Sequence, residues 1–372
     1  MFSERSGNQL NQRLNKQHGI AVLALLSLAL ITITSFMIAA VSLNKQSIDR
    51  NNESAAFLKS IKDQLMGYAL RQATPGLLPC PDTNGDGESN VVGGSCTAQL
   101  GFLPFRTLLM EDGLDNTGAP IWYAVELTYT EVVGGVELNS SLASTVQVDG
   151  LPAAAVILAP GEAIETQIRN NNNVINYLEG INADANTADY TKLSSATLND
   201  QVIALETSYY WQTIEQLVLS ELQARFDEYF NTSNCSELPW PSIATSAPYD
   251  SAANENAGKI PFGTAANHGV ATGCPNSLSA STWLETHWVS EIHYVLCAQL
   301  GNNCLTTIGD NTLTPSAIII APGVSLAGQT RPSAALTDYF ENDNNNSDTQ
   351  FEFNDLRNHN NAFNDQINVI SP

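Results

Sequence analysis

The sequence predicts an α+β chain in which a long N-terminal hydrophobic helix is followed by two tandem domains, each a helix packed on an antiparallel sheet. Three observations lead to this prediction. An uncharged apolar run lies near the N-terminus, a set of short landmarks occurs twice in the same order, and in each copy a helical pattern precedes strand-like runs. A helix beside an antiparallel sheet is an established α+β layer arrangement.

Composition limits the size and the partners of the chain. Its 372 residues, 43% of them hydrophobic, give room for one large domain or two ordinary ones. The 15 Lys and Arg residues face 38 Asp and Glu residues, and the net charge is -23. Because nucleic-acid binding depends on basic side chains that displace counterions from phosphates, we expect no nucleic-acid partner.

The apolar run over residues 19–44 carries no charge, and about 20 apolar residues suffice for a helix to cross a bilayer. Arg5, Arg13 and Lys16 precede it, and positive flanks stay cytoplasmic. We therefore predict a basic leader at 1–19 and a transmembrane helix at 20–44. The protein would be single-pass in the inner membrane, with a cytoplasmic N-terminus and C-terminal domains that are periplasmic or in an extracellular filament. A cleaved secretory signal and a plain signal anchor are the alternatives.

A polar, basic leader that ends in Gly19, directly before the apolar run, resembles the type IV prepilin and pseudopilin signal. The resemblance covers residues 1–45 and implies that a prepilin peptidase cuts between Gly19 and Ile20. That family usually has glutamate at the fifth position after the cut, where this chain has Ala24. The difference argues against a major, repeatedly stacked subunit and points to a minor pilin or tip pseudopilin.

A second helical pattern follows in "SAAFLKSIKDQLMGYAL". Phe57, Ile61, Leu65 and Tyr68 fall on one face of it, so we expect an amphipathic helix that runs into a globular head.

Six landmarks then recur in order, which indicates a duplicated domain. They are "LPCP" and "LPWP", "GFLPFRT" and "GKIPFGT", "WYAVEL" and "HYVLCA", "AAAVILAPG" and "SAIIIAPG", "NYLEG" and "DYFEN", "LNDQVIAL" and "FNDQINVI". The helical pattern also repeats, in "SYYWQTIEQLVLSELQARFDEYF". "AVIL" and "AIII", each stopped by Pro-Gly, read as buried strands. We place the two domains at 45–205 and 206–372.

The landmarks "LPCPDTNGDGE", "GFLPFRTL" and "GAPIWYAV" resemble a group of large pilin-like proteins from bacterial genomes. That resemblance implies pilin-like heads for both domains and gives no specific task.

Six cysteines in an outward-facing chain indicate disulfides. Local pairing is the economical choice among the 15 connectivities that six cysteines allow. The predicted pairs are Cys80–Cys96, Cys235–Cys274 and Cys297–Cys304.

The stretch "DTNGDG" fits the first half of a calcium loop, in which Asp82, Asn84 and Asp86 would supply oxygen ligands. The twelfth position is Gly93 instead of glutamate, so Glu88 would have to substitute. The alternative is an acidic Asx-turn loop at the solvated surface. Both interpretations stay open, and Ca²⁺ is the only cofactor that the sequence suggests.

No G-x-S-x-G, H-E-x-x-H or phosphate-binding glycine loop occurs. His287 and His293 lie near Glu285 and Glu291, which would suit an acid–base cluster, but packed aromatic segments explain the same residues, so we expect no enzyme.

We therefore expect a minor pilin or pseudopilin-like component of a type IV pilus or type II secretion pseudopilus. Its partners would be other pilins or pseudopilins, the inner membrane and a prepilin peptidase. The alternative is a membrane-tethered periplasmic or surface binding protein that does not enter a filament.

Overall fold

The computed structural model describes most of the chain beyond residue 52. The described residues are 28, 30–37, 53–131, 136–164, 167–184, 186–195, 197–233, 238–241, 257–262, 275, 277–279, 281–297, 305–310, 312–333, 335–345, 350–353 and 362–370. The chain divides into two compact units, Met1–Phe57 and Leu58–Pro372. Both sheets described below belong to the second unit.

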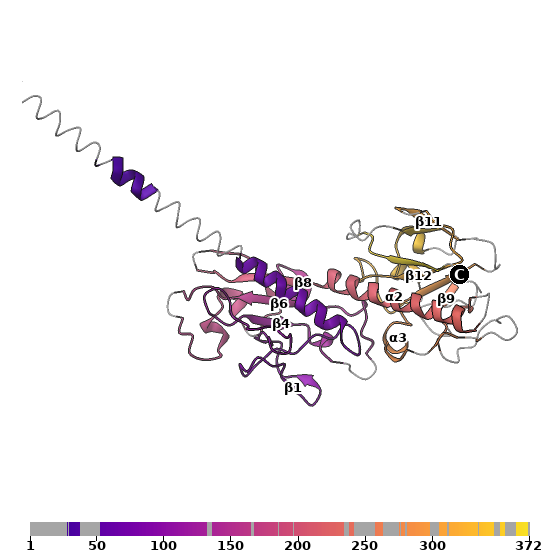
Figure 1. Cartoon of the computed structure of the whole chain (residues 1–372), viewed down its shortest axis with the longest axis horizontal. Helices are drawn as coiled ribbons and strands as arrows, with labels where there is room; N and C mark the ends of the chain where they lie inside the picture. The colour runs from indigo at the N-terminus through magenta and orange to yellow at the C-terminus, as the bar shows by residue number, and fades with distance from the viewer. Residues whose placement is uncertain are drawn as a thin grey trace, which may run out of the picture. The chain divides into compact units, whose positions relative to one another are not determined.

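Short strands dominate the second unit (Figure 1). The strands are β1 (Val91–Val92), β2 (Ser95–Cys96), β3 (Leu100–Phe102), β4 (Trp122–Val125), β5 (Gln147–Val148), β6 (Leu151–Ala159), β7 (Asp189–Tyr190), β8 (Gln201–Glu206), β9 (Ala257–Lys259), β10 (His293–Leu296), β11 (Thr306–Gly309), β12 (Ala317–Ala321), β13 (Gln350–Phe353) and β14 (Gln366–Ile370). The helices are one over 53–70, α2 (Thr207–Ser233) and α3 (Thr282–His287), with the 3-10 turns η1 (Leu127–Tyr129), η2 (Val174–Asn176), η3 (Gly180–Ala183), η5 (Leu336–Asp338) and η6 (Asn342–Asn345).

The first sheet is built on β6, a nine-residue strand whose last seven residues are buried. Strands β4 and β8 pair antiparallel with β6 on its two sides, and β3 pairs antiparallel with β4. The first part of β6 also pairs with β5, which continues to β7 through a parallel pair. The continuous run "AAAVILA" suits this central position because small and β-branched side chains pack well on a sheet that is covered on both faces.

The second sheet repeats the core of the first in the order β14-β12-β10-β9, and all of its pairs are antiparallel. The registers also agree. Trp122 of β4 lies opposite Phe102 of β3 and Leu158 of β6, and in the second sheet His293 lies opposite Lys259 and Ile320. We call the parts built on these two sheets the first and the second head. The two sets of landmarks thus occupy equivalent positions on two sheets of the same pairing pattern.

The helix over 53–70 presents its apolar face to the first head. Ile61, Leu65 and Ala69 are fully buried on it, and the Lys62 ammonium pairs with the Glu206 carboxylate at the end of β8. The spacing of these apolar residues is that of one helix face. The predicted burial of Ile61 and Leu65 is therefore confirmed.

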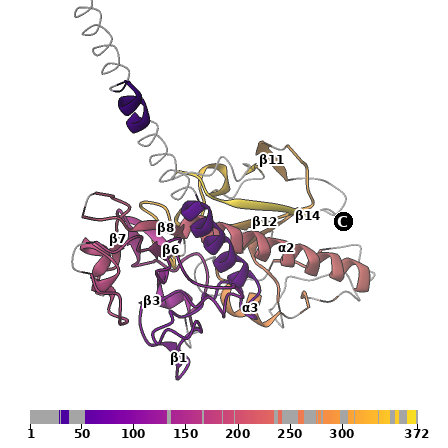
Figure 2. The ribbon, with the colours of Figure 1, turned by 60° about the vertical axis from the view of Figure 1, so that its left-hand side comes forward.

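Helix α2 plays the same part for the second head, where it lies along β12 and β14 in both views (Figure 1, Figure 2). Gln366 of β14 donates hydrogen bonds to the Glu215 carboxylate and to the Gln212 carbonyl, at 2.8 and 3.0 Å. Burial raises the pKa of Glu215 to about 7.

The two heads join without a linker, because α2 begins at Thr207 directly after β8 ends at Glu206. The start of α2 packs on the first head: the Tyr210 hydroxyl donates to the Gly76 carbonyl, and the Trp211 indole N–H donates to the Tyr129 hydroxyl. All four of the large side chains Tyr129, Tyr210, Trp211 and Trp288 are buried there. One helix therefore completes the core of the first head and covers the sheet of the second.

The structure corrects two predictions. Within the part of the chain that the structure describes, no helix has both the length and the apolar character needed to cross a membrane. The predicted span over 20–44 is described only at residues 28 and 30–37, which are helical and exposed. The predicted localisation as a single-pass inner-membrane protein with periplasmic or filament-borne C-terminal domains is therefore not supported.

The predicted fold class is wrong in its particulars. The structure is mixed α+β, but the predicted long hydrophobic helix is not among its described elements, and the strands do not form two simple antiparallel sheets. Parallel pairs join β5 to β7 and β11 to β13, and β11–β13 stands as a separate two-stranded sheet. These strands come from the segments between the landmarks, whose polar, asparagine-rich sequence reads as loops. The expected pilin-like pair of simple helix-plus-sheet heads is thereby overturned.

Candidate functional site

The loop that follows the first helix is closed by the Cys80–Cys96 disulfide, which spans 16 residues. This pair was predicted from local spacing and is confirmed. Cys80 is buried, and its backbone N–H donates to the Ser89 hydroxyl at 2.8 Å. The Tyr123 hydroxyl of β4 donates to the Pro79 carbonyl at 3.1 Å, which ties the start of the loop to the sheet. The same bond recurs in the second head between Tyr294 and Pro239, at 3.0 Å.

Asp82 holds the acidic loop together from inside. Its carboxylate accepts hydrogen bonds from the backbone N–H groups of Asn84, Gly85 and Gly87, at 3.0, 2.6 and 2.6 Å, and only 1% of the residue is exposed. A carboxylate can accept about four hydrogen bonds. Asp82 therefore acts mainly as a staple for the loop backbone.

The remaining predicted ligands lie on the exposed side of the loop. The Asn84 and Asp86 side chains hydrogen-bond one another at 2.9 Å, and the Glu88 backbone N–H donates to Asp86 at 2.8 Å. This backbone bond, followed by the one from Asn84, lowers the pKa of Asp86. The Glu88 carboxylate accepts from the Thr107 hydroxyl at 3.0 Å. No group of three His, Cys, Asp or Glu residues placed to hold a metal occurs in the described ranges, and calcium binding stays a prediction.

A pocket of about 410 Å³ opens beside this stapled loop. Its lining combines aromatic rings, amide and carboxylate groups and loop backbone. The lining residues are Asp82, Asn84, Gly85, Phe102, Leu103, Phe105, Asp112, Gly113, Leu114, Pro120, Asn172 and Tyr177. The volume lies within the range that ligand pockets usually have, roughly 300–1,000 Å³.

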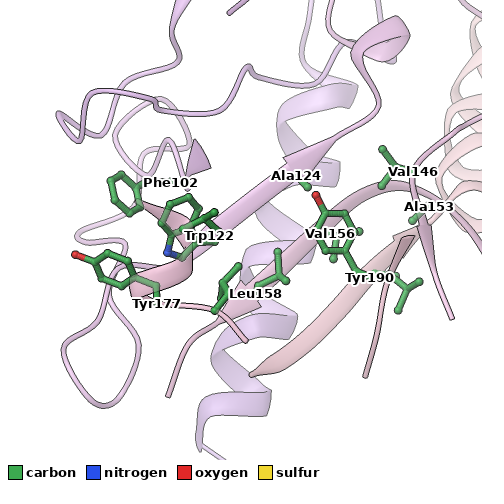
Figure 3. Packing of buried hydrophobic residues seen from close by; sticks show 13 residues of the cluster. Phe102, Trp122, Ala124, Val146, Ala153, Val156, Leu158, Tyr177 and Tyr190 are labelled. Carbon is green, nitrogen blue, oxygen red and sulfur yellow. The ribbon is translucent and has the colours of Figure 1, made fainter. Parts of the chain in front are cut away.

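The aromatic wall of the pocket continues into the core of the first head. Phe102, Trp122 and Tyr177 gather at one end of the buried cluster, away from Val146 and Tyr190 (Figure 3). The Phe102 ring centroid lies 4.6 Å from that of Trp122 and 6.0 Å from that of Tyr177. Tilted and edge-on contacts of this kind stabilise aromatic clusters beyond the area that they bury. The aromatic wall of the pocket is thus held in place by the packed core behind it.

A buried polar network, which the sequence analysis did not identify, closes the far end of the first sheet. The Glu179 backbone N–H donates to Asp200 at 3.1 Å, and the Asn199 backbone N–H donates to the Glu179 carboxylate at 3.1 Å. The Asn182 amide also donates to Asp200, at 3.1 Å. The Asp200 and Glu179 carboxyl groups thus belong to one network of shared hydrogen-bond donors. Burial is the main cause that raises the pKa of Asp200 to about 8, and the neighbouring Glu179 adds to it.

Arg169 completes this network by holding the loop that follows β6. Its guanidinium donates to the Gly161 carbonyl, eight residues earlier, at 2.5 Å and to the Gln167 side chain at 3.2 Å. Gln167 in turn donates to the Glu179 carboxylate at 2.7 Å. The Tyr177 ring lies under the guanidinium, 5.6 Å from it.

The second head contains the same network. The Glu341 backbone N–H and the Asn344 amide donate to Asp365 at 2.9 and 3.0 Å, and the Asn364 backbone N–H donates to Glu341 at 3.1 Å. Gln329 donates to the Glu341 carboxylate at 2.6 Å. Burial and the Glu341 charge raise the pKa of Asp365 well above its ordinary range.

The arginine is repeated as well. Arg331 donates to the Gly323 carbonyl, again eight residues earlier, at 2.7 Å, and to the Tyr339 carbonyl at 2.8 Å. The signal that could have revealed the network is "QIR" beside "QTR", each at the same distance after the repeated Ala-Pro-Gly.

The histidines considered for catalysis are packing residues in the structure. His287 and His293 are 3% and 5% exposed, and His287 Nδ1 accepts from the Leu138 backbone N–H at 3.1 Å. Burial lowers the pKa of both, that of His293 to about 4. His287 therefore links the second head to the Leu138 segment of the first.

Several predicted site residues lie outside the described residues. These are Gly19 and Ile20 at the predicted cleavage point, and Cys235, Cys274 and Cys304. Cys297 is disulfide-bonded, and no described cysteine is free. The pairings Cys235–Cys274 and Cys297–Cys304 stay predictions.

The chain matches no protein-family model, no curated protein and no solved structure.

Proposed function

We propose that the chain is a structural subunit that works through contacts with other proteins and not through catalysis, in the manner of a minor pilin or pseudopilin of a type IV pilus or type II secretion pseudopilus. The observation that carries this proposal is the fused pair of heads. Strand β8 runs into α2 without a linker, and Tyr210 and Trp211 of that helix fill the core of the first head. Such a junction favours a rigid subunit whose two heads present their surfaces to other proteins.

The use of buried polar groups also supports a structural role. Asp82, Arg169 and Arg331 form hydrogen bonds mainly with backbone groups of loops in their own head. The carboxyl pairs Glu179–Asp200 and Glu341–Asp365 are internal to the two heads. Groups committed in this way stabilise loops and leave little free for acid–base chemistry on a substrate.

The disulfides indicate the kind of compartment in which the subunit works. Cys80–Cys96 is formed, and Cys297 is also in a disulfide. Disulfides persist in oxidising compartments and are rare in the reducing cytosol.

Processing gives the first test. When the chain is co-expressed with a prepilin peptidase, we expect mass spectrometry of the product to show a new N-terminus at Ile20. A Gly19→Leu variant serves as the control and should stay intact. An uncut wild-type chain would remove the pilin assignment.

Cross-linking gives the second test. A photo-reactive amino acid at exposed Thr337 in the second head should yield adducts with other pilins or pseudopilins in cells that assemble a filament. The pocket beside the stapled loop favours a second candidate, a binding protein that does not enter a filament. Adducts that never contain a pilin would support that candidate and contradict the first.

A further inference from the structure

The pocket in the first head has walls that are fixed before any ligand arrives. Phe105 is held between two glycines, because a Cβ on Gly87 would come within 2.4 Å of its ring and a Cβ on Gly113 within 3.0 Å. The side of Gly85 that faces the pocket is bordered by the Asn172 amide and the Phe102 ring edge, 3.6 and 3.8 Å from where a Cβ would stand. Aromatic rings and an amide group therefore meet at one concave surface.

The charge of the lining argues against an ionic ligand. None of the described residues that line the pocket is a lysine or an arginine, so this lining offers no cation to a phosphate or carboxylate. Its carboxylates are partly committed: Asp82 already accepts three backbone hydrogen bonds, and Asp112 accepts one from the Leu114 N–H at 3.3 Å. A cationic ligand would therefore find no concentrated free charge. An uncharged ligand with many hydroxyl groups fits best.

Comparison of the two heads shows that, of the three aromatic lining residues, Phe105 and Tyr177 have aromatic counterparts in the second head and Phe102 does not. Phe102 and Trp122 face each other in the register of the first sheet, where the second sheet has Lys259 and His293. Tyr177 and Tyr339 are the same residue type at equivalent places beside the repeated arginines. The two aromatic residues at β3 and β4 are thus special to the first head, next to the stapled loop that carries Asp82.

We infer that this pocket binds an uncharged saccharide, one ring face against the Phe102, Phe105 and Tyr177 wall and its hydroxyls on the Asn172 amide and the Asp112 carboxylate. The apolar face of a sugar ring packs on aromatic side chains, and its hydroxyls both donate and accept. Asn supplies both kinds of partner, and Asp supplies acceptors. The inference does not depend on assembly into a filament.

The test is calorimetric titration of the full chain with three neutral disaccharides: maltose, cellobiose and N,N′-diacetylchitobiose. We expect saturable binding of at least one of them. Asn172→Ala should weaken it about fivefold, the effect of losing roughly one hydrogen bond. Asn170→Ala is the matched control, because Asn170 is an exposed amide in the same segment that does not line the pocket, and it should bind like wild type.

A second variant guards against a purely structural effect. Phe102→Leu removes the ring and keeps an apolar side chain in the core beside Trp122, and it should weaken binding while the melting transition remains cooperative. Arginine methyl ester and glucose 6-phosphate serve as the cationic and anionic probes. The inference is overturned if none of the three disaccharides binds, if either charged probe binds more tightly, or if Asn172→Ala and Asn170→Ala bind alike. Prepilin processing is unaffected by these outcomes, so the two proposals fail separately.

Discussion

Buried Asp200 of the first head should make the stability of the protein depend on pH, and Asp200→Asn should remove the part of that dependence that Asp200 contributes. Asp200 is buried near Glu179, and burial, together with the Glu179 charge, raises the pKa of Asp200 to about 8 from its ordinary 3.8. The oxygen of an amide at this position can still accept from the Glu179 N–H and the Asn182 amide, and an amide takes up no proton. The variant therefore keeps the hydrogen bonds of the network, but residue 200 no longer takes up a proton.

The sign follows from the raised pKa. An acid whose pKa is higher in the folded state contributes stability that is fully present below its unfolded pKa and is lost as pH rises through the folded value. Between about pH 4 and pH 8 the free energy of unfolding should therefore fall by up to ~1.4 kcal/mol per pH unit because of this group. At pH 7 the loss relative to pH 4 is at most about 4 kcal/mol.

The assay is urea unfolding of wild type and Asp200→Asn at several pH values from 4.5 to about 8, with the difference in free energy plotted against pH. We expect the free energy of unfolding of the variant, relative to that of wild type, to rise with pH by ~0.5–1.4 kcal/mol per pH unit. Asp63→Asn, at an exposed position of the first helix, is the control and should give a flat difference. A flat difference for Asp200→Asn as well would refute the raised pKa of Asp200.

Two further predictions concern the stapled loop. Gly87→Ala should destabilise the protein by ~2–4 kcal/mol in thermal or urea unfolding, since Gly87 has a φ of 85° and a Cβ would collide with the Phe105 ring. Gly118→Ala has a φ of 83° with nothing within 4 Å, so it should lose only the ~1 kcal/mol of backbone strain; equal losses would discard the collision argument. Replacing both Cys80 and Cys96 by serine should lower the free energy of unfolding by about 3 kcal/mol through the freed loop. If the double variant unfolds like wild type, the loop is held by its hydrogen bonds alone.

The central strands were predictable because they are decided by local pattern. "AVIL" and "AIII" are short apolar runs ended by Ala-Pro-Gly, and both lie in the buried parts of β6 and β12. The Cys80–Cys96 bridge was predictable for a similar reason, since short spacing favours closure. Ile61 and Leu65 followed from helix periodicity.

The candidate site was less accessible to sequence reasoning because its parts are distant in the chain. The pocket needs Asp112 and Asn172 beside the loop of Asp82, and no local pattern indicates that these segments meet. The hydrogen bonds that Asp82 makes inside the loop were not indicated by the sequence, which left a calcium loop and an Asx-turn loop as open alternatives.

The polar networks were missed for another reason. Gln167, Arg169 and their repeats lie in asparagine-rich segments that have the composition of solvated loops, and composition does not show which loop residues turn inward. Comparison of the two copies residue by residue would have revealed them. Duplication within one chain thus carries information that periodicity does not.

The absence of a linker between β8 and α2 has a practical consequence for dissecting this protein. Cutting between Glu206 and Thr207 would remove Tyr210 and Trp211 from the first head and leave the Gly76 carbonyl and the Tyr129 ring exposed to water. A truncated first head must therefore include the first turns of α2. Any further part of α2 that is kept in such a fragment would expose to water the apolar face that covers the second sheet. A protease that samples the native protein meets no exposed tether at this junction, so limited digestion should cut elsewhere and release neither head intact.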